Sequence, residues 1–313
     1  MSELVIETAG LERSFGDVHA VRGVDLAVTG GEIYGFLGPN GAGKSTVVKM
    51  LITLLQPTGG QATVLGHDVV AGADAIRLRI GAALQDASLD EKQSGREILQ
   101  LQGALYGLTR SETDARIDEL SSLIEVEAID RWIGTYSGGM RRRLDLAASL
   151  MHNPDLLFLD EPTTGLDPQS RAQVWQEVRA LNEQLGTTIF LTTQYLEEAD
   201  ELADRVGIIN DGQIVGEGTP DELKRAIGAD VIQVSVDDND AAVAALEALP
   251  DVDKVERGPR ALLVSVNDGA AAVSPVVIAL DTAGVSVGEL TLRTPTLDDV
   301  FLELTGDRIE VSQ

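Results

Sequence analysis

The amino-acid sequence predicts an α/β fold with a largely parallel sheet, followed by a smaller α+β domain. Three short apolar runs, at residues 33–37, 156–159 and 188–193, show little alternation and are bounded by polar or glycine-rich segments. Runs of this kind are typical of parallel strands that are buried on both faces. Helix-like stretches lie between them, which is the order expected of an α/β sheet.

Composition excludes several classes of protein. The chain has 313 residues, a length that suggests about two domains. Its net charge of −27 argues against a partner made of duplex nucleic acid. The absence of cysteine excludes disulfides, cysteine-ligated zinc and thiol catalysis, and the three histidines are too widely spaced to favour a histidine metal site. No apolar stretch reaches membrane-spanning length and no signal-peptide pattern opens the sequence, so a soluble protein is expected.

A glycine-rich loop follows the first apolar run. Residues 38–46 fit the pattern G-x-x-x-x-G-K-[ST], between the strand 33–37 and a helix-like stretch at 46–55. Glycines allow backbone N–H groups to close around phosphate oxygens, and the N-terminus of a helix adds positive potential. Lys44 should reach the β and γ phosphates, and the Ser45 hydroxyl should bind Mg²⁺. The predicted phosphate-binding residues are Gly38, Pro39, Asn40, Gly41, Ala42, Gly43, Lys44, Ser45 and Thr46.

Two carboxylates end the second apolar run. Asp160 and Glu161 follow residues 156–159 and should lie at the carboxyl end of a buried strand, where ligands bind in open α/β sheets. Asp160 is expected to hold Mg²⁺ through water, and Glu161 is expected to polarise the attacking water. The alternative is a solvated strand end followed by a helix cap. The phosphate loop elsewhere in the chain favours the metal site.

A serine and two glycines precede three arginines. Ser137 should cap a helix whose first amides, left accessible by Gly138 and Gly139, face an anion. The arginines at 141–143 stand in the first turn, where each cation opposes the helix dipole by roughly 0.3–1 kcal/mol. A nearby phosphate would offset this cost. The alternative is that the arginines pair with surface acids.

Together these motifs resemble the nucleotide-binding subunit of an ATP-binding cassette (ABC) transporter. The phosphate loop, the signature at 136–140, the carboxylate motif at 156–161 and the turn at 165–167 have the order and spacing of that family. The resemblance extends from residue 3 to about residue 227. It implies a P-loop cassette in which an antiparallel β subdomain and a helical subdomain join the parallel-sheet core.

The resemblance implies roles for further residues. Gln85 would sense Mg²⁺ and water and face the membrane subunit, Phe15 would stack on adenine, and Asp167 would belong to the nucleotide site. Gln85 could instead be an ordinary surface residue and Phe15 a core aromatic. Gln194 stands at the switch position, where most cassettes have histidine. Its amide can donate a hydrogen bond to a γ-phosphate oxygen, but it cannot titrate near neutral pH.

The signature also departs from the family pattern. It begins with Tyr136 instead of leucine and ends with Met140 instead of glutamine, whereas the implied γ-phosphate contacts at 137–139 are intact. A narrower resemblance, to the daunorubicin-resistance type of ATP-binding subunit, rests on residues 136–140, 192–200 and 294–306.

The implied function is that of a motor subunit. In that family, the signature of one subunit closes the nucleotide site of the other. One copy of this chain has one phosphate loop and one signature and cannot complete a site alone. Two copies, or this chain and a second nucleotide-binding subunit, would therefore form a head-to-tail dimer with two ATP. Hydrolysis of ATP with Mg²⁺ would drive export of drugs or lipids through a separate permease, with this chain peripheral at the cytoplasmic face of the membrane. One alternative is a soluble ABC ATPase that remodels nucleic acid or ribosomes, although the expected second cassette, helical insertion or basic surface is lacking. Another is a non-hydrolysing regulatory subunit, which Lys44, Asp160 and Glu161 argue against and Gln194 leaves open.

A second domain is predicted to begin at Gly228–Ala229, which gives the domains 1–228 and 229–313. A hairpin signal at Asp211–Gly212 and a helix start at 219–222 end the first domain. A β-α-β-β-α-β order then suggests a ferredoxin-like module. Strands are expected at 232–236, 261–266 and 285–292, helices at 241–249 and 270–283, and an amphipathic tail helix at 294–306. This domain could brace the dimer, regulate it or bind a small ligand. The apolar stripe of the tail favours bracing.

Overall fold

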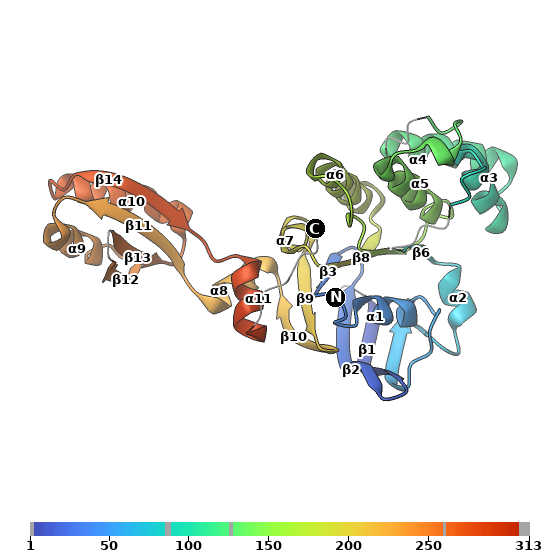
Figure 1. Cartoon of the computed structure of the whole chain (residues 1–313), viewed down its shortest axis with the longest axis horizontal. Helices are drawn as coiled ribbons and strands as arrows, with labels where there is room; N and C mark the ends of the chain where they lie inside the picture. The colour runs from blue at the N-terminus through green and yellow to red at the C-terminus, as the bar shows by residue number, and fades with distance from the viewer. Residues whose placement is uncertain (1–2, 85–88, 125–127, 259–260, 307–313) are drawn as a thin grey trace. The chain divides into compact units, whose positions relative to one another are not determined.

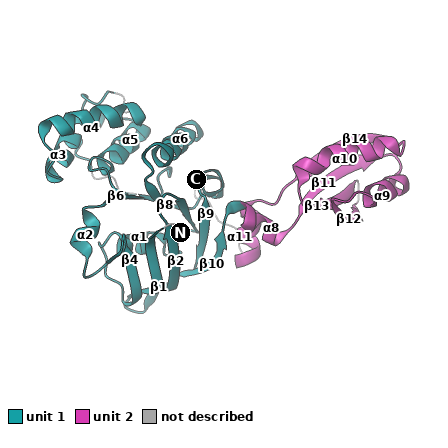
Figure 2. Ribbon diagram, turned by 180° about the vertical axis from the view of Figure 1, so that it is seen from behind, with its two compact units in different colours: residues 1–220, 308–313 teal, residues 221–307 magenta. Residues whose placement is uncertain are grey.

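The chain folds into two compact units, which Figures 1 and 2 show. The computed structural model describes residues 3–84, 89–124, 128–258 and 261–306. The division falls between Pro220 and Asp221, so helix α8 (Pro220–Ile227) lies almost wholly in the second unit, although the sequence placed it before the boundary at Gly228–Ala229. The domain limits 1–228 and 229–313 stay a prediction.

The centre of the first unit is a six-stranded sheet. The predicted buried runs form its strands β3, β7 and β8, and every residue of these strands is buried. Neighbouring strands from β9 to β6 pair in parallel, and β10 pairs antiparallel with β9. In spatial order the strands are β10 (Gln213–Gly218), β9 (Arg205–Asn210), β3 (Ile33–Leu37), β8 (Thr188–Thr193), β7 (Leu156–Asp160) and β6 (Ile80–Ala83).

An antiparallel sheet packs on one side of this core, as the resemblance implied. Its strand order is β2 (Val18–Thr29), β1 (Leu4–Phe15), β4 (Gly59–Val64) and β5 (His67–Asp68). Apolar side chains of this sheet, such as Ile6 and Val64, share one hydrophobic cluster with Phe158 and Phe190 of the parallel sheet and with helix α1 (Lys44–Leu51).

Helices cover the opposite face of the parallel sheet. Leu157 and Leu191 share a second cluster with Leu99, Leu144 and Val178 of three helices. Alternate residues of β7 and β8 therefore enter different clusters, which explains why these runs are apolar throughout. Figure 1 shows α3, α4 and α5 grouped as a helical subdomain. The helices of this unit are α2 (Ala73–Arg77), α3 (Gly95–Leu105), α4 (Arg110–Leu123), α5 (Gly138–Ser149), α6 (Pro168–Leu185) and α7 (Leu196–Leu202), with a 3₁₀ turn at Ile133–Thr135.

The second unit has the predicted ferredoxin-like order. An antiparallel sheet with the order β12-β13-β11-β14 carries two helices. Its elements are β11 (Asp230–Val236), α9 (Asn239–Glu247), β12 (Val252–Arg257), β13 (Leu262–Val266), α10 (Gly269–Thr282) and β14 (Val287–Arg293). The sequence did not locate β12, because it is an edge strand in which only Val252 and Val255 are half-buried and the other residues are exposed.

The predicted tail helix is α11 (Leu297–Thr305). Thr296 and Asp299 form a capping box at its start, and Gly306 ends it in the left-handed conformation. Three residues of its apolar stripe, Leu297, Val300 and Phe301, are buried within the chain. Most of the face that favoured a bracing role is thus covered, whereas Leu304 of the same stripe is 41% exposed. Among the described residues, no helix combines the length and the apolar character needed to cross a membrane.

Candidate functional site

The phosphate loop joins the end of β3 to the start of α1. Two of its glycines are required by the space around them. A Cβ at Gly38 would lie 2.3 Å from the carbonyl oxygen of Ile209, and one at Gly43, where φ is +106°, would lie 2.6 Å from the carbonyl oxygen of Ala20. Helix α1 begins at Lys44, so its first N–H groups face the loop. The sequence thus builds an anion-binding turn that larger residues could not form.

Lys44 lies in this turn and is buried. Its ammonium donates to the carbonyl oxygens of Gly38 at 2.8 Å and Pro39 at 3.1 Å, and lies 3.2 Å from Oε1 of Glu161. The three donors of the ammonium therefore have three oxygen partners. Burial lowers the pKa of Lys44, and the carboxylates of Glu161 and Asp160 oppose that shift. A positive charge is thus held at the N-terminus of α1.

Asp160 ends β7 beside the phosphate loop. Its Oδ1 accepts hydrogen bonds from Ser45 Oγ at 3.2 Å and from Thr192 Oγ1 at 2.5 Å. Ser45 and Asp160 thus bring a hydroxyl and a carboxylate oxygen together. Mg²⁺ prefers such oxygen ligands and is usually bound by few protein groups, with water and phosphate completing its shell. The donor set fits Mg²⁺, and the described residues contain no cluster of three or more acidic or histidine side chains that would hold a metal without a phosphate.

Glu161 follows in a strained backbone conformation. Its φ is +50°, which is unfavourable for a residue with a Cβ. The backbone N–H of Glu161 donates to both the carbonyl oxygen and Oγ1 of Thr192, each at 3.1 Å, and these bonds hold the turn. Oε2 accepts from Thr164 Oγ1 at 3.2 Å. The turn thus brings the carboxylate to the ammonium of Lys44.

Gln194 follows β8 and completes the wall of the cavity. It is 3% exposed, and its Oε1 is buried with no hydrogen-bond partner among the described residues. The cavity has a volume of about 480 Å³, a size typical of ligand pockets. It is lined by Ala20, Asn40, Gly41, Gly43, Lys44, Ser45, Thr46, Glu161, Thr164 and Gln194. The structure therefore brings together residues predicted from three separate motifs.

Other predicted residues lie outside the lining of this cavity. Phe15 is 47% exposed at the end of β1, with the guanidinium of Arg13 4.5 Å from its ring centroid, so it is a surface and not a core aromatic. Asp167 caps α6, and its hydrogen bonds with Ser170 and Gln169 lower its pKa. Gln85 lies outside the described residues.

The signature forms the start of α5. Ser137 caps this helix as predicted, accepting from the N–H of Met140 at 3.2 Å. A Cβ at Gly138 would lie 3.9 Å from Leu166, and one at Gly139 would lie 3.7 Å from Ser170. These are ordinary contacts, so packing within the chain does not require either glycine.

The two departures in the signature have a structural explanation. Tyr136 is buried in the hydrophobic cluster between the parallel sheet and the helices, and its hydroxyl donates to the carbonyl oxygen of Ala128 at 3.0 Å. Met140 is partly buried against the same cluster. Both side chains serve the packing beneath the helix, while Ser137 and Gly138 stay exposed.

The sequence missed three residues of the site. Thr192 and Thr164 bond the two carboxylates, and Ala20 lines the cavity from the β1–β2 hairpin. The register of β7 against β8 pairs Asp160 with Thr192, so this contact follows once the strand order is known. Nothing local in the sequence indicates Ala20.

Two family matches and several relatives cover the chain. The ABC transporter family matches residues 21–164, and the C-terminal domain of DrrA1-3-like ATP-binding proteins matches residues 218–305. The chain is 49% identical to the daunorubicin resistance ATP-binding protein DrrA3 of Streptomyces coeruleorubidus, over 100% of this chain and 99% of that protein. It is 38% identical to the Nod factor export ATP-binding protein I of Rhizobium sp. (strain N33), over 99% of this chain and 100% of that protein.

Solved structures agree with these matches. The structure of cbiO1 from Clostridium perfringens, described as part of the ABC transporter complex cbiONQ, has a TM-score of 0.66 at 26% identity and covers 72% of this chain and 93% of its own. An ATP-binding cassette solved as a dimer with ADP and Pi is similar in fold, with a TM-score of 0.62 at 24% identity over 68% of this chain and 98% of its own.

Proposed function

The chain belongs to the family of ABC transporter ATP-binding proteins, and from that premise we propose that it is the ATP-hydrolysing subunit of an exporter whose permease is a separate chain. The observation that carries the proposal is the convergence of Lys44, Ser45, Glu161 and Gln194 on one cavity, with Asp160 accepting a hydrogen bond from Ser45 beside it. These side chains are what phosphoryl transfer to water requires: positioning groups and charges, with little covalent chemistry.

Each side chain has a proposed role in hydrolysis. The loop amides and Lys44 bind the β and γ phosphates and stabilise the charge that develops on them. Glu161 polarises the water that attacks the γ phosphorus, and Gln194 donates its amide N–H to a γ-phosphate oxygen. Mg²⁺, held by Ser45 and Asp160, would neutralise phosphate charge. Phe15 supplies an exposed ring on which adenine can stack.

Two copies of the chain form the working unit in this proposal. The spare room at Gly138 and Gly139 supports it, because a small residue that internal packing does not require suits close approach by an outside group. Ser137, Gly138 and Gly139 would bind the γ phosphate held by a partner cassette, and Asp167 would lie near it at the start of α6. The exposed helix N-terminus offers amides to that phosphate.

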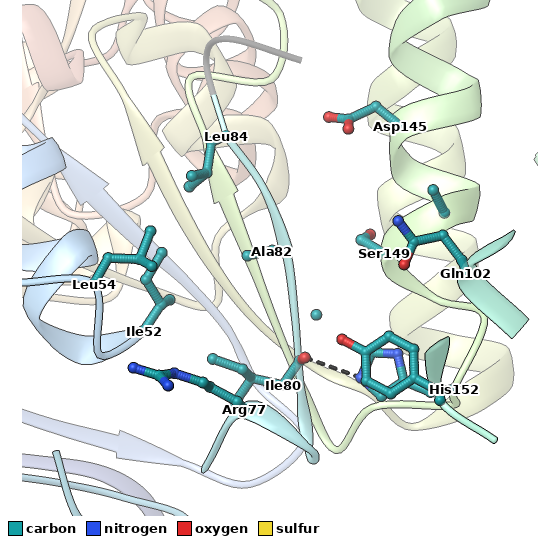
Figure 3. A pocket seen from close by; sticks show the side chains of 13 residues that line it. Ile52, Leu54, Arg77, Ile80, Ala82, Leu84, Gln102, Asp145, Ser149 and His152 are labelled. Atoms are coloured by element: carbon teal, nitrogen blue, oxygen red, sulfur yellow. Dashed lines mark hydrogen bonds between the residues drawn. The ribbon is translucent and has the colours of Figure 1, made fainter. Parts of the chain in front are cut away.

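The permease is proposed to dock beside the helical subdomain. A pocket of about 370 Å³ lies between α5 and strand β6, and Leu84, which precedes Gln85, lines it (Figure 3). Its apolar rim includes Leu54, which is 62% exposed. Docking there would place the chain at the cytoplasmic face of the membrane. Two relatives are named for daunorubicin resistance and for Nod factor export, and these names support export as the direction and a drug as a candidate cargo.

A regulatory, non-hydrolysing role is the second candidate, and Gln194 at the switch position is its support. The two are separated by phosphate release from Mg-ATP by the purified chain, with and without its permease, beside Glu161→Gln. We expect the native chain to hydrolyse ATP and Glu161→Gln to be inactive. We also expect ATP to stabilise a dimer of the variant. No hydrolysis even with the permease would overturn the motor role and favour the regulatory one.

A further inference from the structure

The three consecutive arginines of α5 have three different sets of partners. Arg141 pairs with Glu91 at 2.9 Å, and both side chains are well exposed. Arg143 pairs with Glu177 of α6 at 2.8 Å in a buried ion pair. Arg142 points between these two, toward the parallel sheet. The paired acids account for Arg141 and Arg143, but they do not account for the contacts of Arg142.

Arg142 contacts the ends of two strands. Its Nη1 donates to the carbonyl oxygen of Leu84 at 2.9 Å, and its Nη2 lies 3.4 Å from the carbonyl oxygens of both Ala83 and Asp160. Nη1 also donates to Asp145 Oδ2, one turn along α5, at 3.3 Å. Only 12% of the Arg142 side chain is exposed. One buried guanidinium thus joins α5 to the carboxyl ends of β6 and β7.

These strand ends carry parts of the nucleotide site. β7 ends at Asp160, the proposed Mg²⁺ ligand, and β6 ends at Ala83, two residues before Gln85. Helix α5 itself begins with the signature glycines. Arg142 is therefore bonded to the end of the strand that bears the metal carboxylate and to the residues that precede Gln85, and it stands on the helix whose start would serve a partner's nucleotide.

The guanidinium is suited to transmit a displacement between these segments. It is planar, its donors are fixed in one fork, and it is bound by three backbone carbonyls and one carboxylate. Since it is buried, a donor that loses its acceptor is not readily hydrated, so relative movement of helix and strands is costly. Figure 3 shows Asp145 pointing from α5 toward the side of the pocket where Leu84 lies.

We infer that Arg142 is a positioning residue that couples the metal-binding end of this chain's sheet to its own signature helix, and thereby one ATP site of the dimer to the other. The inference rests on the proposed head-to-tail dimer, in which the signature completes the partner's site. Nucleotide bound at Asp160 and Ser45 fixes the position of the end of β7. The hydrogen bonds of Arg142 then hold α5 in a defined position relative to that strand end. In that position the signature presents its amides to the second ATP. Such a link supplies the coupling free energy that cooperative closure requires.

The test separates binding at one site from closure of two. Three variants are made in a Glu161→Gln background. Arg142→Lys keeps the charge but cannot bridge the same carbonyls, and Arg142→Met removes both the charge and the hydrogen bonds. Arg141→Met is the matched control one residue away. Nucleotide affinity of the monomer is measured with a fluorescent ATP analogue, and ATP-driven dimerisation by sedimentation. Thermal unfolding checks that each variant is folded. If Arg142→Met does not fold, the test rests on Arg142→Lys alone.

The expected result is a split between the two measurements. Arg142→Lys should leave monomer affinity within about twofold, weaken ATP-driven dimerisation by about tenfold or more, and lower the Hill coefficient of ATP hydrolysis toward one when Glu161 is restored. Arg141→Met should change none of these. Unchanged dimerisation, or an equal loss of monomer affinity and dimerisation, would overturn the inference. If Glu161→Gln alone does not dimerise with ATP, the proposed dimer fails and the inference fails with it.

Discussion

Lys44 Nζ lies 3.2 Å from Oε1 of Glu161, and both side chains are buried. The cation proposed to hold the terminal phosphates and the carboxylate proposed to polarise water therefore compensate each other's charge inside the protein. A change at one of them leaves the other buried without its counter-charge. Roles in catalysis and in stability are combined in this pair.

The first prediction is a double-substitution cycle on that pair. Lys44→Met should lower the unfolding free energy by about 3 kcal/mol, because it leaves the Glu161 carboxylate uncompensated. Adding Glu161→Gln should restore more than half of that loss. Urea unfolding followed by tryptophan fluorescence measures this, since Trp132 and Trp175, the two tryptophans of the chain, both lie in the first unit. No recovery in the double variant would contradict the pairing.

The control for that cycle is an exposed pair in the same unit. Arg141 and Glu91 lie 2.9 Å apart with side chains 39% and 63% exposed. Arg141→Met should therefore cost no more than about 1 kcal/mol, as is usual for surface ion pairs.

The second prediction concerns Gln194. Gln194→Ala should lower kcat for ATP hydrolysis by about 100-fold, because one amide donor to the γ phosphate is lost. Gln194→His should restore much of the rate and add a pH-dependent change near pH 6.5, which the native glutamine cannot produce. The measurement is kcat from pH 6 to 9 for the three proteins. Unchanged turnover in Gln194→Ala would show that the residue does not position the phosphate.

The third prediction contrasts two glycines. Gly138→Ala places its Cβ 3.9 Å from Leu166, so the unfolding free energy should change by less than about 1 kcal/mol while ATP-driven dimerisation and turnover are lost. Gly43→Ala would place its Cβ 2.6 Å from the carbonyl oxygen of Ala20 at φ +106°, and should destabilise the first unit by about 1–3 kcal/mol. Chemical unfolding and sedimentation separate the two effects. Normal dimerisation of Gly138→Ala would exclude close approach at this position.

The fourth prediction is a pH dependence of stability from Asp145. Burial raises the pKa of Asp145 to about 6, against 3.8 as its ordinary value, and Arg142 opposes that shift. The folded chain thus binds this proton more tightly than the unfolded chain. The contribution of Asp145 to stability is fully present below pH 3.8 and is lost as the pH rises through 6.

Relative to Asp145→Asn, the native chain should therefore lose on the order of 1 kcal/mol of unfolding free energy between pH 5 and pH 7.5. Urea unfolding at the two pH values measures the difference. Asp167→Asn is the control, because the pKa of Asp167 is lowered and its contribution changes only below this range. A pH-independent difference between the native chain and Asp145→Asn would contradict the raised pKa.

The sequence predicted the centre of the first unit, but not the bounds of its antiparallel strands, because the signals at the centre are local. Apolar runs predicted β3, β7 and β8, and glycine spacing predicted the turn at 38–46. The edge strand β12 escaped because it has no regular apolar alternation. Local periodicity reports burial, and an edge strand buries too little of its surface to show it.

Contacts between distant segments were beyond the sequence for a different reason. The bond from Thr192 to Asp160 depends on the order of strands in the sheet, which a single sequence does not specify. The arginines at 141–143 illustrate the same limit, since the sequence offered either a phosphate or surface acids as partners. Arg142 instead binds three carbonyl oxygens that carry no side-chain signal.

The adjacency of β3, β8 and β7 determines which changes of chain length the first unit can accept. The phosphate loop directly follows β3, Gln194 directly follows β8, and the two carboxylates are the last residue of β7 and the residue after it. Removing a single residue from within β8 would shift its pairing with β7 by one position and turn Thr192 to the opposite face, away from Asp160. Insertions in surface loops leave that register untouched. Deletions inside these three strands should therefore abolish the site outright, whereas equally short insertions in surface loops should spare it.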